Sequence, residues 1–390
     1  MTTSPASAPS PAPAGASAWV SVDLDAIRDN VAELARRAGS AQVMAVVKGD
    51  AYGHGLVPAA GACLDAGATW LGVAQLAEAL ELRAAGVTAP LLTWLFPPGG
   101  DVAGAIEADI DVTVGSGWVL DAVIAAVRER GRPARVQVKV DTGLGRGGVL
   151  TDWSEMVHRV AAAQAEGTIE VTGVWSHFAW ADAPQHPTVR AQQARFLDAC
   201  GELERAGVRP ALRHLANSAA TLTNSSAHFD MVRPGLAVYG LSPVPDLGDP
   251  AHFGLREAMR VTARLTLVKR ARAGQGVSYG HEYVTDRDTV LGLVPMGYAD
   301  GIPRSAGGRG PVLVDDRRLP VAGRVCMDQF VVDLGPGFAG AAGDEVVVLG
   351  RAADGEPCAQ DWAEAAGTIN YEIVTRMGPR LPRVLLGRRA

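Results

Sequence analysis

The chain contains 390 residues, of which 48% are hydrophobic and 20% are charged. These proportions are typical of a soluble globular protein, and the length predicts two or three domains. Thirty-six Lys and Arg against 42 Asp and Glu leave a net charge of −6. This balance provides no electrostatic reason to expect a nucleic acid or an anionic membrane as a partner.

The first residues and the cysteines exclude other classes of protein. Residues 1–17 are rich in Ala, Ser and Pro, which predicts a disordered tail, and they lack the positive charge and apolar core of a secretory signal. No run of about 18 apolar residues occurs, so we expect no membrane span. Without a C-x-x-C pair or a zinc-ligand spacing, we expect reduced thiols in a cytoplasmic protein. The four cysteines are Cys63, Cys200, Cys326 and Cys358.

Short apolar runs alternate with amphipathic stretches from about residue 19 to residue 239. The first helix has Asp23 as its N-cap and apolar residues at helical spacing until Gly39. Eight strands follow, at residues 42–47, 70–73, 91–95, 111–114, 134–140, 171–175, 211–215 and 230–232. Eight β/α units in roughly 220 residues predict an α/β barrel, a (β/α)8 TIM-like barrel over residues 18–250. An open doubly wound sheet is the alternative.

The pattern changes beyond about Leu255, where strands separated by turns predict a mostly antiparallel β domain over residues 251–390. The Pro-, Asp- and Gly-rich residues 242–254 are the expected boundary. Residues 360–366 and 369–377 are expected to be helical. The expected strands lie at residues 261–271, 290–295, 311–314, 330–334 and 345–349.

Polar residues gather where the predicted barrel strands end. The active site of a TIM-like barrel is built at the carboxyl ends of its strands, so one pocket could collect these side chains. They are Lys48 after the first strand, Lys139, Asp141 and Arg146 at and after the fifth, His177 after the sixth, Asn217 and Ser218 after the seventh, and Arg233 after the eighth.

Lys48 follows six mainly apolar strand residues and has two interpretations. It is a reactive amine whose pKa is lowered by its surroundings and which forms a Schiff base, or it is an ordinary lysine that reaches from the strand end into water. Tyr52, Gly53 and Gly55 in the following loop suit a backbone that approaches a phosphate, but they also suit a plain turn.

The segment from Gly143 to Gly148, GLGRGG, matches the G-x-G-x-x-G fingerprint of a dinucleotide-binding turn. Glu166 or Glu170 could then be the acidic residue that nicotinamide-dependent dehydrogenases place about 20 positions later. The match follows the fifth strand instead of opening a βαβ unit, and Arg146 would crowd a cofactor there. A lone glycine fingerprint is weak evidence, so the dehydrogenase is a minor alternative.

Three further residues are ambiguous on their own. Arg233, between an apolar strand and Pro234 and Gly235, is a surface arginine or a fixed guanidinium that donates to a ligand. His177 is a core histidine or part of a site, and without a second His at i+3 to i+5 no metal site is predicted. Tyr279 is a packing residue or an acid–base group.

These residues lie in segments that strongly resemble the alanine racemase family, fold-type III enzymes that use pyridoxal 5′-phosphate (PLP). The resemblance runs from about Trp19 to Arg383 and rests on several independent blocks in the right order. The blocks are AVVKGDAYGHG, KVDTGLGRGG, SHFAWAD, ANSAA, MVRPGLAVYG, GVSYGHEY, GYADGIPR, VCMDQF and TINYE.

The resemblance implies a two-base mechanism that interconverts L- and D-alanine. Lys48 would hold PLP covalently and act as the base for D-alanine, and Tyr279 would act on the opposite face as the base for L-alanine. In the family the tyrosine comes from the other subunit of a homodimer. The use that the family implies is D-alanine for peptidoglycan.

The resemblance also implies the cofactor contacts. Arg233 would hydrogen-bond the pyridine nitrogen and keep it unprotonated, and His177 would link Arg233 toward Tyr279. The other cofactor-binding residues, most of them at the phosphate, would be Tyr52, Asn217, Ser218, Gly235, Leu236 and Tyr371.

Substrate contacts follow from the same resemblance. Arg146 would contact the phenolic oxygen of the cofactor and the substrate carboxylate, and the N–H of Met327 would donate to that carboxylate. Lys139 matches a lysine that is carbamylated in some members, where it orients the arginine. A narrow entry corridor would favour a small side chain. Its residues would be Tyr298, Arg304, Arg324, Asp328 and Ile369.

Three rival interpretations share the barrel. A PLP-dependent amino-acid decarboxylase should have a Gly-Gly-Gly phosphate loop and a C-terminal Cys-Glu-Ser-like segment, and neither is found. Tyr371 argues for alanine against a broad-substrate racemase. A non-catalytic PLP carrier would end near residue 240 and would lack an equivalent of Tyr279. Departures from the family pattern are mild: Gly49 stands where Ala is common, and Leu144 stands where Met is common.

Overall fold

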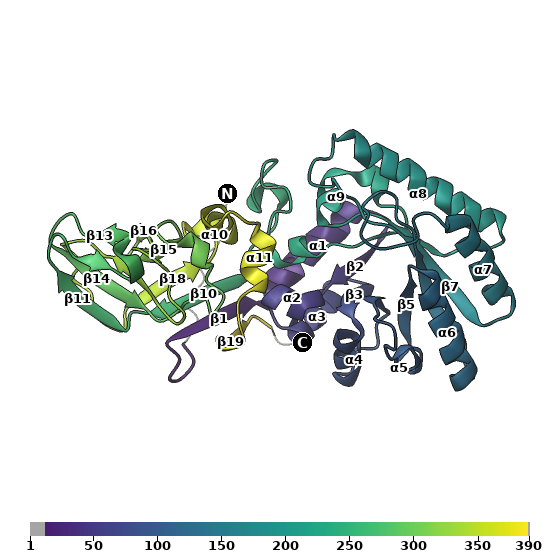
Figure 1. Ribbon diagram of the computed structural model, residues 1–390, viewed down its shortest axis with the longest axis horizontal. Helices are drawn as coiled ribbons and strands as arrows, with labels where there is room; N and C mark the ends of the chain where they lie inside the picture. The colour runs from purple at the N-terminus through teal and green to yellow at the C-terminus, as the bar shows by residue number, and fades with distance from the viewer. Residues whose placement is uncertain (1–11, 389–390) are drawn as a thin grey trace. The chain divides into compact units, whose positions relative to one another are not determined.

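The structure, a computed structural model, describes residues 12–388 and contains two compact units (Figure 1). The barrel unit comprises residues 27–51 and 56–255. The β unit comprises the described residues up to Ala26, residues 52–55, and the described residues from Arg256 onward. Most of the predicted N-terminal tail, residues 1–11, lies outside the described residues, and residues 12–17 contain a turn but neither a helix nor a strand.

Within residues 12–388, eight parallel strands form the sheet of the barrel unit, in the order β8-β7-β6-β5-β4-β3-β2-β9. The strands are β2 (Gln42–Val46), β3 (Trp70–Gln75), β4 (Leu91–Leu95), β5 (Ile110–Val114), β6 (Ala134–Lys139), β7 (Ile169–Trp175), β8 (Leu212–His214) and β9 (Met231–Val232). The ends of the sheet meet where Asp230 N donates to Arg213 O (3.1 Å) and Arg233 N donates to Ala216 O (2.9 Å). The sheet therefore nearly closes, which confirms the predicted TIM-like barrel and its eight strands.

Helices cover the outside of this barrel (Figure 1). α1 (Leu24–Ala38) begins where Asp23 Oδ1 accepts a hydrogen bond from Ala26 N (2.9 Å), and it ends before Gly39, whose φ is +67°. This confirms the predicted cap and stop. The later helices are α3 (Leu56–Asp65), α4 (Leu76–Ala84), α5 (Val102–Glu107), α6 (Gly117–Arg130), α7 (Trp153–Ala165), α8 (Pro187–Arg205) and α9 (Ser218–Thr223).

The largest sheet of the β unit has the order β16-β15-β18-β10-β1-β19. In it, β1 (Ala18–Asp23) runs antiparallel to β10 (Met259–Arg264) and parallel to β19 (Arg383–Leu386). The other strand pairs of this sheet are antiparallel, which agrees with the predicted mostly antiparallel arrangement. Sequence analysis did not identify β1 as a strand. The remaining strands are β15 (Pro311–Val314), β16 (Arg317–Pro320) and β18 (Glu345–Leu349).

The predicted single strand over residues 261–271 is wrong, because the chain changes sheets in its middle. Leu265 N donates to Asp344 O (2.9 Å) and Thr266 N donates to Leu293 O (2.9 Å), so the chain leaves β10 and enters a second, three-stranded sheet, β11-β14-β17. A short pair, β12-β13, stands apart. These strands are β11 (Leu267–Ala271), β12 (Gly276–Val277), β13 (Tyr283–Val284), β14 (Thr289–Val294) and β17 (Phe330–Asp333).

A tight turn and two helices complete the β unit. Asp315 and Asp316 connect β15 to β16 with φ values of +48° and +59°, and a positive φ at both central residues is typical of a type I′ hairpin turn. Helices α10 (Ala359–Ala366) and α11 (Asn370–Thr375) confirm the two predicted helical segments. None of the helices between residues 12 and 388 combines the length and apolar character needed to cross a bilayer.

Candidate active site

A left-handed turn follows β2 directly. It is helix α2 (Lys48–Gly53), in which residues 49–53 all have a φ between +52° and +82°. Gly adopts this conformation readily, but each of the other three residues, Asp50, Ala51 and Tyr52, costs about 1–2 kcal/mol. Backbone strain of this kind concentrates at functional sites. The turn fixes the direction in which the chain leaves Lys48.

Carboxylates hold this turn in place. Gly49 N donates to Glu78 Oε1 (2.6 Å), and Leu56 N donates to Asp50 Oδ1 (2.7 Å). Glu78 is itself fixed, because its Oε2 accepts two backbone N–H groups at the start of α4 (3.0 Å each). Sequence analysis missed Glu78, since a glutamate in the first turn of a helix looks like an ordinary capping residue.

Lys48 carries a partly buried amine. Burial lowers the pKa of this amine, the positive charge of Arg146 lowers it further, and Glu78 acts in the opposite direction. Its Nζ lies 5.9 Å from the centre of the Trp94 ring on β4. A lowered pKa leaves more of the amine in the neutral, nucleophilic form that Schiff-base formation needs.

Two tryptophans connect the cationic side chains of the barrel unit. Trp94 and Trp175 meet edge to face, with ring centres 6.0 Å apart. Lys139 Nζ lies 4.3 Å, and Arg233 Cζ 4.8 Å, from the centre of the Trp175 ring, where the ring quadrupole attracts a cation. Sequence analysis missed both tryptophans, because an aromatic residue in an apolar strand looks like any other core residue.

Lys139 titrates in an unusual range. Burial, Arg233 and Arg146 lower its pKa to about 8, while Asp141 acts to raise it. Lys48 also lowers this pKa, so the four cations lie close enough to repel one another. A cluster of side chains with this excess of positive charge favours anionic ligands.

The glycine-rich segment after β6 closes around a carboxylate of its own. Asp141 accepts four backbone N–H groups, at 2.9–3.1 Å, from Gly143, Leu144, Gly145 and Arg146. Burial acts to raise the pKa of Asp141, but these four donors hold it below its ordinary value. Asp141 therefore fills the nest of N–H groups that a dinucleotide pyrophosphate would need. The glycine fingerprint does not support a dehydrogenase.

Backbone hydrogen bonds join the two ends of this glycine-rich loop. Asp141 N donates to Val149 O (2.9 Å), and Val149 N donates to Lys139 O (2.9 Å). Gly148 has a φ of +118°, and a Cβ at this position would lie 2.8 Å from Asp141 N, so only glycine fits. Arg146 is exposed, and no carboxylate in the described chain forms an ion pair with its guanidinium. The loop thus presents an unpaired cation.

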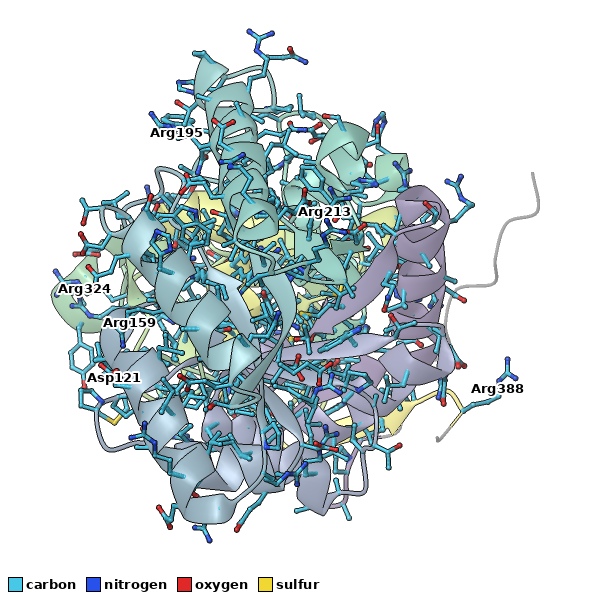
Figure 2. The ribbon with its side chains drawn as sticks, turned by 90° about the vertical axis from the view of Figure 1, so that its right-hand side faces the viewer. Asp121, Arg159, Arg195, Arg213, Arg324 and Arg388 are labelled. Atoms are coloured by element: carbon cyan, nitrogen blue, oxygen red, sulfur yellow. The ribbon has the colours of Figure 1, made fainter. Side chains whose placement is uncertain are left out.

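Helix α8 supports the loops after β6 and β7. Arg195 Nη1 donates to Thr142 O (3.1 Å), from the outer side of the barrel unit (Figure 2). Gln192 Nε2 donates to Thr142 Oγ1 (3.2 Å) and to His177 O (3.1 Å). One helix therefore fixes both the glycine-rich loop and the backbone of His177.

Arg233 is a buried guanidinium whose hydrogen-bond partners are all neutral. It donates to Ser176 O (2.7 Å), His214 Nδ1 (3.1 Å) and His177 Nδ1 (3.3 Å). Burial lowers its pKa to about 9, so Arg233 is still protonated at neutral pH. Burial and the charge of Arg233 hold the pKa of both histidines well below 6.5, so both rings are neutral. Such a cation suits a ligand with a neutral acceptor.

Donors for an anion gather at the start of α9. Asn217 caps this helix, because its Oδ1 accepts the backbone N–H three residues later (3.0 Å). Ser218 Oγ accepts Gly235 N (2.8 Å) and Ala237 N (3.3 Å), on either side of Leu236. Two amides aimed at one oxygen atom are an arrangement that binds anionic oxygens.

In the β unit, Tyr52 and Tyr371 are neighbours, with ring centres 6.3 Å apart. Gly53 makes this approach possible: its φ is +82°, and a Cβ there would lie 2.5 Å from Val374 O of α11. Burial, and to a lesser degree Tyr371, raises the pKa of Tyr52, so its hydroxyl stays protonated and can donate a hydrogen bond.

Tyr279 follows a strained serine in the β unit. Ser278 has a φ of +61° and a ψ of −170°, a region that essentially only glycine adopts. Its Oγ donates to Arg324 O (2.8 Å), which holds the serine in this conformation. The Tyr279 side chain is 72% exposed. The strained position thus precedes an exposed tyrosine directly.

The other predicted residues of the β unit lie on loops that are bonded to each other. Tyr298 N donates to Cys326 O (3.1 Å), which joins the segments around residues 298 and 326. Arg324 Nε donates to Glu282 Oε1 (2.6 Å). The exposed or half-exposed members of the set are Tyr298, Arg304, Arg324, Met327, Asp328 and Ile369.

The residues predicted for the site belong to both units. The barrel unit brings Lys48, Lys139, Arg146, His177 and Arg233 into electrostatic contact. The predicted tyrosines and corridor residues belong to the β unit. No group of three or more His, Cys, Asp or Glu among residues 12–388 is arranged to hold a metal ion.

The chain matches two family models along almost its whole length. Residues 22–243 match alanine racemase, N-terminal domain, and residues 258–385 match alanine racemase, C-terminal domain. The alanine racemase of Frankia casuarinae is 58% identical over 363 residues, which is 93% of this chain and 94% of that protein. The alanine racemase of Thermobifida fusca is 56% identical over 367 residues, 94% of this chain and 97% of that protein.

Solved structures give the same result. The alanine racemase from D-cycloserine-producing Streptomyces lavendulae aligns with a TM-score of 0.95 and 58% identity, covering 96% of this chain and 98% of that one. The alanine racemase from Bacillus anthracis with bound L-Ala-P aligns with a TM-score of 0.88 and 37% identity, covering 96% of each chain.

Proposed function

The chain belongs to the alanine racemase family, and from that premise we propose that it interconverts L- and D-alanine with PLP, using Lys48 and Tyr279 as its two bases. Racemisation needs one group that removes the α-proton and a second that returns a proton to the opposite face. An amine and a phenol on separate units can supply these two groups. The chain is an isomerase by its family.

The side chains of the barrel unit fit PLP. When bound, PLP supplies an electron-withdrawing ring that acidifies the α C–H of an amino acid. The amine of Lys48, with its lowered pKa, suits the covalent attachment and later the role of base for D-alanine. The excess of positive charge around it suits a phosphorylated ligand that carries a substrate carboxylate.

Arg233 would donate to the pyridine nitrogen. A guanidinium that is protonated at neutral pH keeps such a nitrogen unprotonated, because the two would otherwise be like charges in contact. The ring is then a weaker electron sink, which suppresses side reactions. His177 accepts from Arg233 at Nδ1, so its Nε2 carries the proton and can donate onward, toward Tyr279 in this proposal.

The phosphate would lie against the donors at the start of α9 and the tyrosine pair. The amides of Gly235 and Ala237 already donate to Ser218 Oγ, so the proton of that hydroxyl can be donated to a phosphate oxygen. The protonated hydroxyl of Tyr52 is a further donor. The proposed residues are Tyr52, Asn217, Ser218, Gly235, Leu236 and Tyr371.

Arg146 would bind the substrate carboxylate, helped by the backbone N–H of Met327. Its guanidinium lacks a carboxylate partner in the described chain, and the loop that carries it is rigid because Asp141 holds four of its amides. Carbamylation of Lys139 would place a negative charge beside Arg146 and fix its direction, and a pKa of about 8 provides the neutral amine that this reaction needs.

The second base would come from a partner subunit of a homodimer. The exposure of Tyr279, at 72%, supports a role that is completed by another chain. The corridor that admits alanine would be lined by residues of the same β unit. They are Tyr298, Arg304, Arg324, Asp328 and Ile369.

We further propose the cellular setting that the family implies, which is D-alanine supply for peptidoglycan in the cytoplasm. In this proposal residues 18–250 form the PLP-binding domain, and residues 251–390 form the β domain that supplies Tyr279. The observation that carries the proposed function is the Lys48 amine, with a lowered pKa, on a strained left-handed turn.

The test is incubation of the purified, PLP-loaded protein with L-alanine in D2O, following α-deuteration and chirality together. We expect α-deuterated D-alanine. Exchange without inversion would show that only one base works, and the role of Tyr279 would be wrong. Release of CO2 would identify a decarboxylase, and no reaction with PLP bound through lysine would indicate a carrier.

A further inference from the structure

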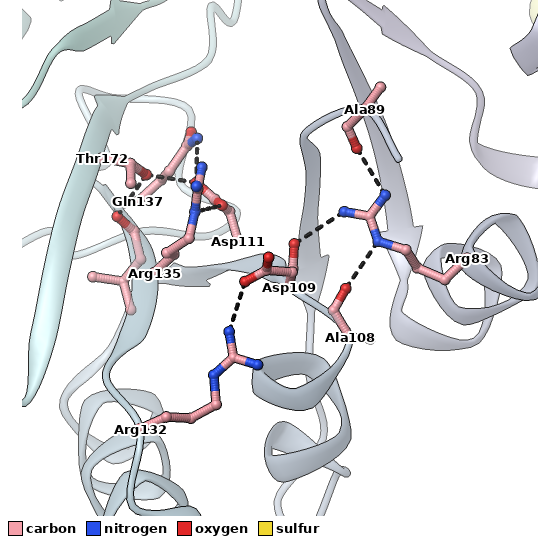
Figure 3. A network of polar contacts seen from close by, with 10 residues as sticks. Arg83, Ala89, Ala108, Asp109, Asp111, Arg132, Arg135, Gln137 and Thr172 are labelled. Atoms are coloured by element: carbon pink, nitrogen blue, oxygen red, sulfur yellow. Dashed lines mark hydrogen bonds and ion pairs between the residues drawn. The ribbon is translucent and has the colours of Figure 1, made fainter. Parts of the chain in front are cut away.

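A column of buried polar side chains runs inside the barrel beneath Arg233. His214 on β8 donates to Gln137 Oε1 on β6 through its Nε2 (2.8 Å), and Gln137 Nε2 donates to Asp111 Oδ2 on β5 (3.1 Å). Thr172 Oγ1 on β7 donates to the same carboxylate oxygen (2.5 Å). All four side chains are buried, and Figure 3 shows Asp111, Gln137 and Thr172 converging.

The column ends at the amino ends of the strands, opposite the candidate active site. Arg135 Nε donates to Asp111 Oδ1 (2.8 Å) at that end. Arg132 donates to Asp109 Oδ1 (2.8 Å) beside it, and Arg83 donates to backbone carbonyl groups of the same rim (Figure 3). A charged rim on one side of the barrel is thereby connected through hydrogen bonds to Arg233 on the other.

The donor and the acceptor of each hydrogen bond in the column can be worked out from Asp111, the residue at the end of the column away from Arg233. A carboxylate paired with Arg135 only accepts, so Gln137 must turn its NH2 toward Asp111 and its carbonyl oxygen toward His214. A carbonyl oxygen only accepts, so the proton of neutral His214 must be on Nε2. Nδ1 of His214 then carries a lone pair and can accept the hydrogen bond from Arg233 Nη1 (3.1 Å).

We propose that Gln137 and Asp111 are positioning residues, which fix the His214 proton on Nε2 and thereby hold the Arg233 guanidinium where the pyridine nitrogen needs it. This inference rests on the proposed function for what Arg233 does, but not for the state of His214. If Nδ1 carried the proton instead, it would face the Arg233 donor, and the guanidinium would have to move.

The orientation of His214 is otherwise already fixed by stacking. Its ring lies parallel to Trp175, at an interplanar angle of 9° and a centre-to-centre distance of 5.8 Å. Stacking holds the plane of the ring but does not choose between the two tautomers. The tautomer is set by the two groups that contact the ring nitrogens, the Arg233 donor at Nδ1 and the Gln137 acceptor at Nε2. The orientation of Gln137 is in turn set by Asp111.

The first variant is Gln137→Leu, which removes the acceptor for His214 Nε2 at similar volume. We expect kcat for alanine to fall about tenfold to a hundredfold, the range seen when a residue that orients a functional ligand is lost. We expect KM for alanine to change by less than about threefold, because Gln137 acts through Arg233 and not on the substrate. A long-range proton–nitrogen correlation spectrum of 15N-histidine protein should show His214 leaving the Nε2–H tautomer.

The rescue variant is Gln137→Glu. The introduced carboxyl group would lie against Asp111, and because the two cannot both be ionised at that distance, one takes a proton. An acceptor for His214 Nε2 is thereby kept, so this variant should retain the Nε2–H tautomer and lose less kcat than Gln137→Leu. A purely structural role for Gln137 would not produce this difference in tautomer.

Thr172→Val and Thr113→Val form a matched pair. Both remove a buried hydroxyl from a barrel strand, but the hydroxyl of Thr113 on β5 has no hydrogen-bond partner in the described chain, whereas that of Thr172 bonds to Asp111. We expect Thr172→Val to lower kcat severalfold and Thr113→Val to leave it unchanged. This pair keeps the test valid if Gln137→Leu does not fold.

The outcomes separate this inference from the proposed function. If the unaltered protein racemises alanine, but His214 keeps its tautomer and kcat stays normal in Gln137→Leu and Thr172→Val, the inference is overturned and the function stands. If the unaltered protein does not racemise alanine, the function fails, and the tautomer of His214 still decides the inference. A His214 ring protonated at Nδ1 in the unaltered protein would also overturn it.

Discussion

Lysine is scarce in this chain, which uses it where a removable charge matters. Only Lys48, Lys139 and Lys269 are lysines among 36 basic residues. The first two belong to the cluster of cations in the barrel unit and have a lowered pKa, and Lys269 is exposed on β11. An arginine in place of Lys48 or Lys139 would stay charged and could neither attack a carbonyl carbon nor react with CO2. Residue chemistry therefore separates these two lysines from the arginines beside them, Arg146 and Arg233.

The pKa of Lys139 leads to a prediction at this scale. Because the pKa is about 8, the neutral amine that forms a carbamate should dominate above that pH. With 13C-bicarbonate we expect a carbamate signal in the 13C NMR spectrum that strengthens as pH rises through 8. Lys139→Gln should abolish the signal and Lys269→Gln should keep it. A signal that survives in Lys139→Gln would place the modification elsewhere.

The same shift has a consequence for stability. The pKa of Lys139 falls from 10.5 to about 8 on folding, so the unfolded chain binds more protons between these values. The contribution of this residue to the free energy of unfolding therefore rises with pH across that window. Urea denaturation at pH 8 and at pH 10, compared with Lys139→Gln, measures it. An equal pH dependence in both proteins would contradict the assignment.

Ser278 permits a further prediction, because the effects of backbone strain and of the hydrogen bond at this residue can be separated. Ser278→Ala loses the bond to Arg324 O and keeps the strained φ, whereas Ser278→Gly loses the bond and relieves the strain. We expect the Gly variant to be more stable than the Ala variant by about 1 kcal/mol. Chemical denaturation of both variants gives the comparison. Equal stability, or a more stable Ala variant, would show that the serine backbone is not strained.

At the residue scale, sequence analysis located the polar side chains but not what supports them. Lys48 and Arg233 were visible because a charge at the end of an apolar strand is unusual. Trp175, His214 and Gln137 were not, because inside a strand they differ little from core residues. Their roles depend on which side chains of neighbouring strands they face, and that follows only from the register of the closed sheet.

At the scale of elements, the barrel was predictable and much of the β unit was not. The barrel strands are buried on both faces and appear as continuous apolar runs. In the β unit, β12 and β13 have only two residues each, and β16 contains Arg317 and Arg318. None of these strands therefore shows the run or alternation of apolar residues by which a strand is recognised in a sequence. β10 and β11 were fused because the apolar pattern continues through Leu265.

The loop that carries Arg146 supports a prediction at this scale. In Asp141→Asn an NH2 group replaces one acceptor oxygen, so one backbone N–H of the loop faces a donor. We expect the free energy of unfolding to fall by about 1.5–3 kcal/mol, the range for hydrogen bonds to a charged group, and KM for alanine to rise. Asp152→Asn is the control, because Asp152 is exposed and its side chain caps nothing. An unchanged KM would show that Asp141 does not position Arg146.

The pKa of Asp141 determines whether the stability contributed by this loop rises or falls with pH. Four amide donors hold the pKa below its ordinary value, so the folded carboxyl group is ionised over a wider range than the unfolded one. The stability that it contributes is fully present above the unfolded value, about 3.9, and is lost as pH falls through the lower, folded value. Asp141→Asn should remove this acid-dependent component.

At the scale of the whole molecule, the proposed homodimer can be tested by mixing two inactive chains. If Tyr279 serves the Lys48 of a partner, a mixed dimer of Lys48→Ala and Tyr279→Phe chains has one intact site and one doubly altered site. Random assortment should then restore about a quarter of the normal activity on co-expression. Each variant expressed alone should have almost none. No recovery from a verified mixed dimer would show that both bases act within one chain.

β1 and β19 are the first and the last strands of the described chain, yet they are parallel neighbours in one sheet. During synthesis β1 leaves the ribosome first, and the partner on its far edge is made only when the chain is nearly finished. The barrel unit, residues 27–51 and 56–255, is complete well before that moment. A nascent chain therefore carries β1 with both edges unpaired until β10 and then β19 emerge. Such edges are where chaperones bind and where neighbouring chains on a polysome can pair wrongly.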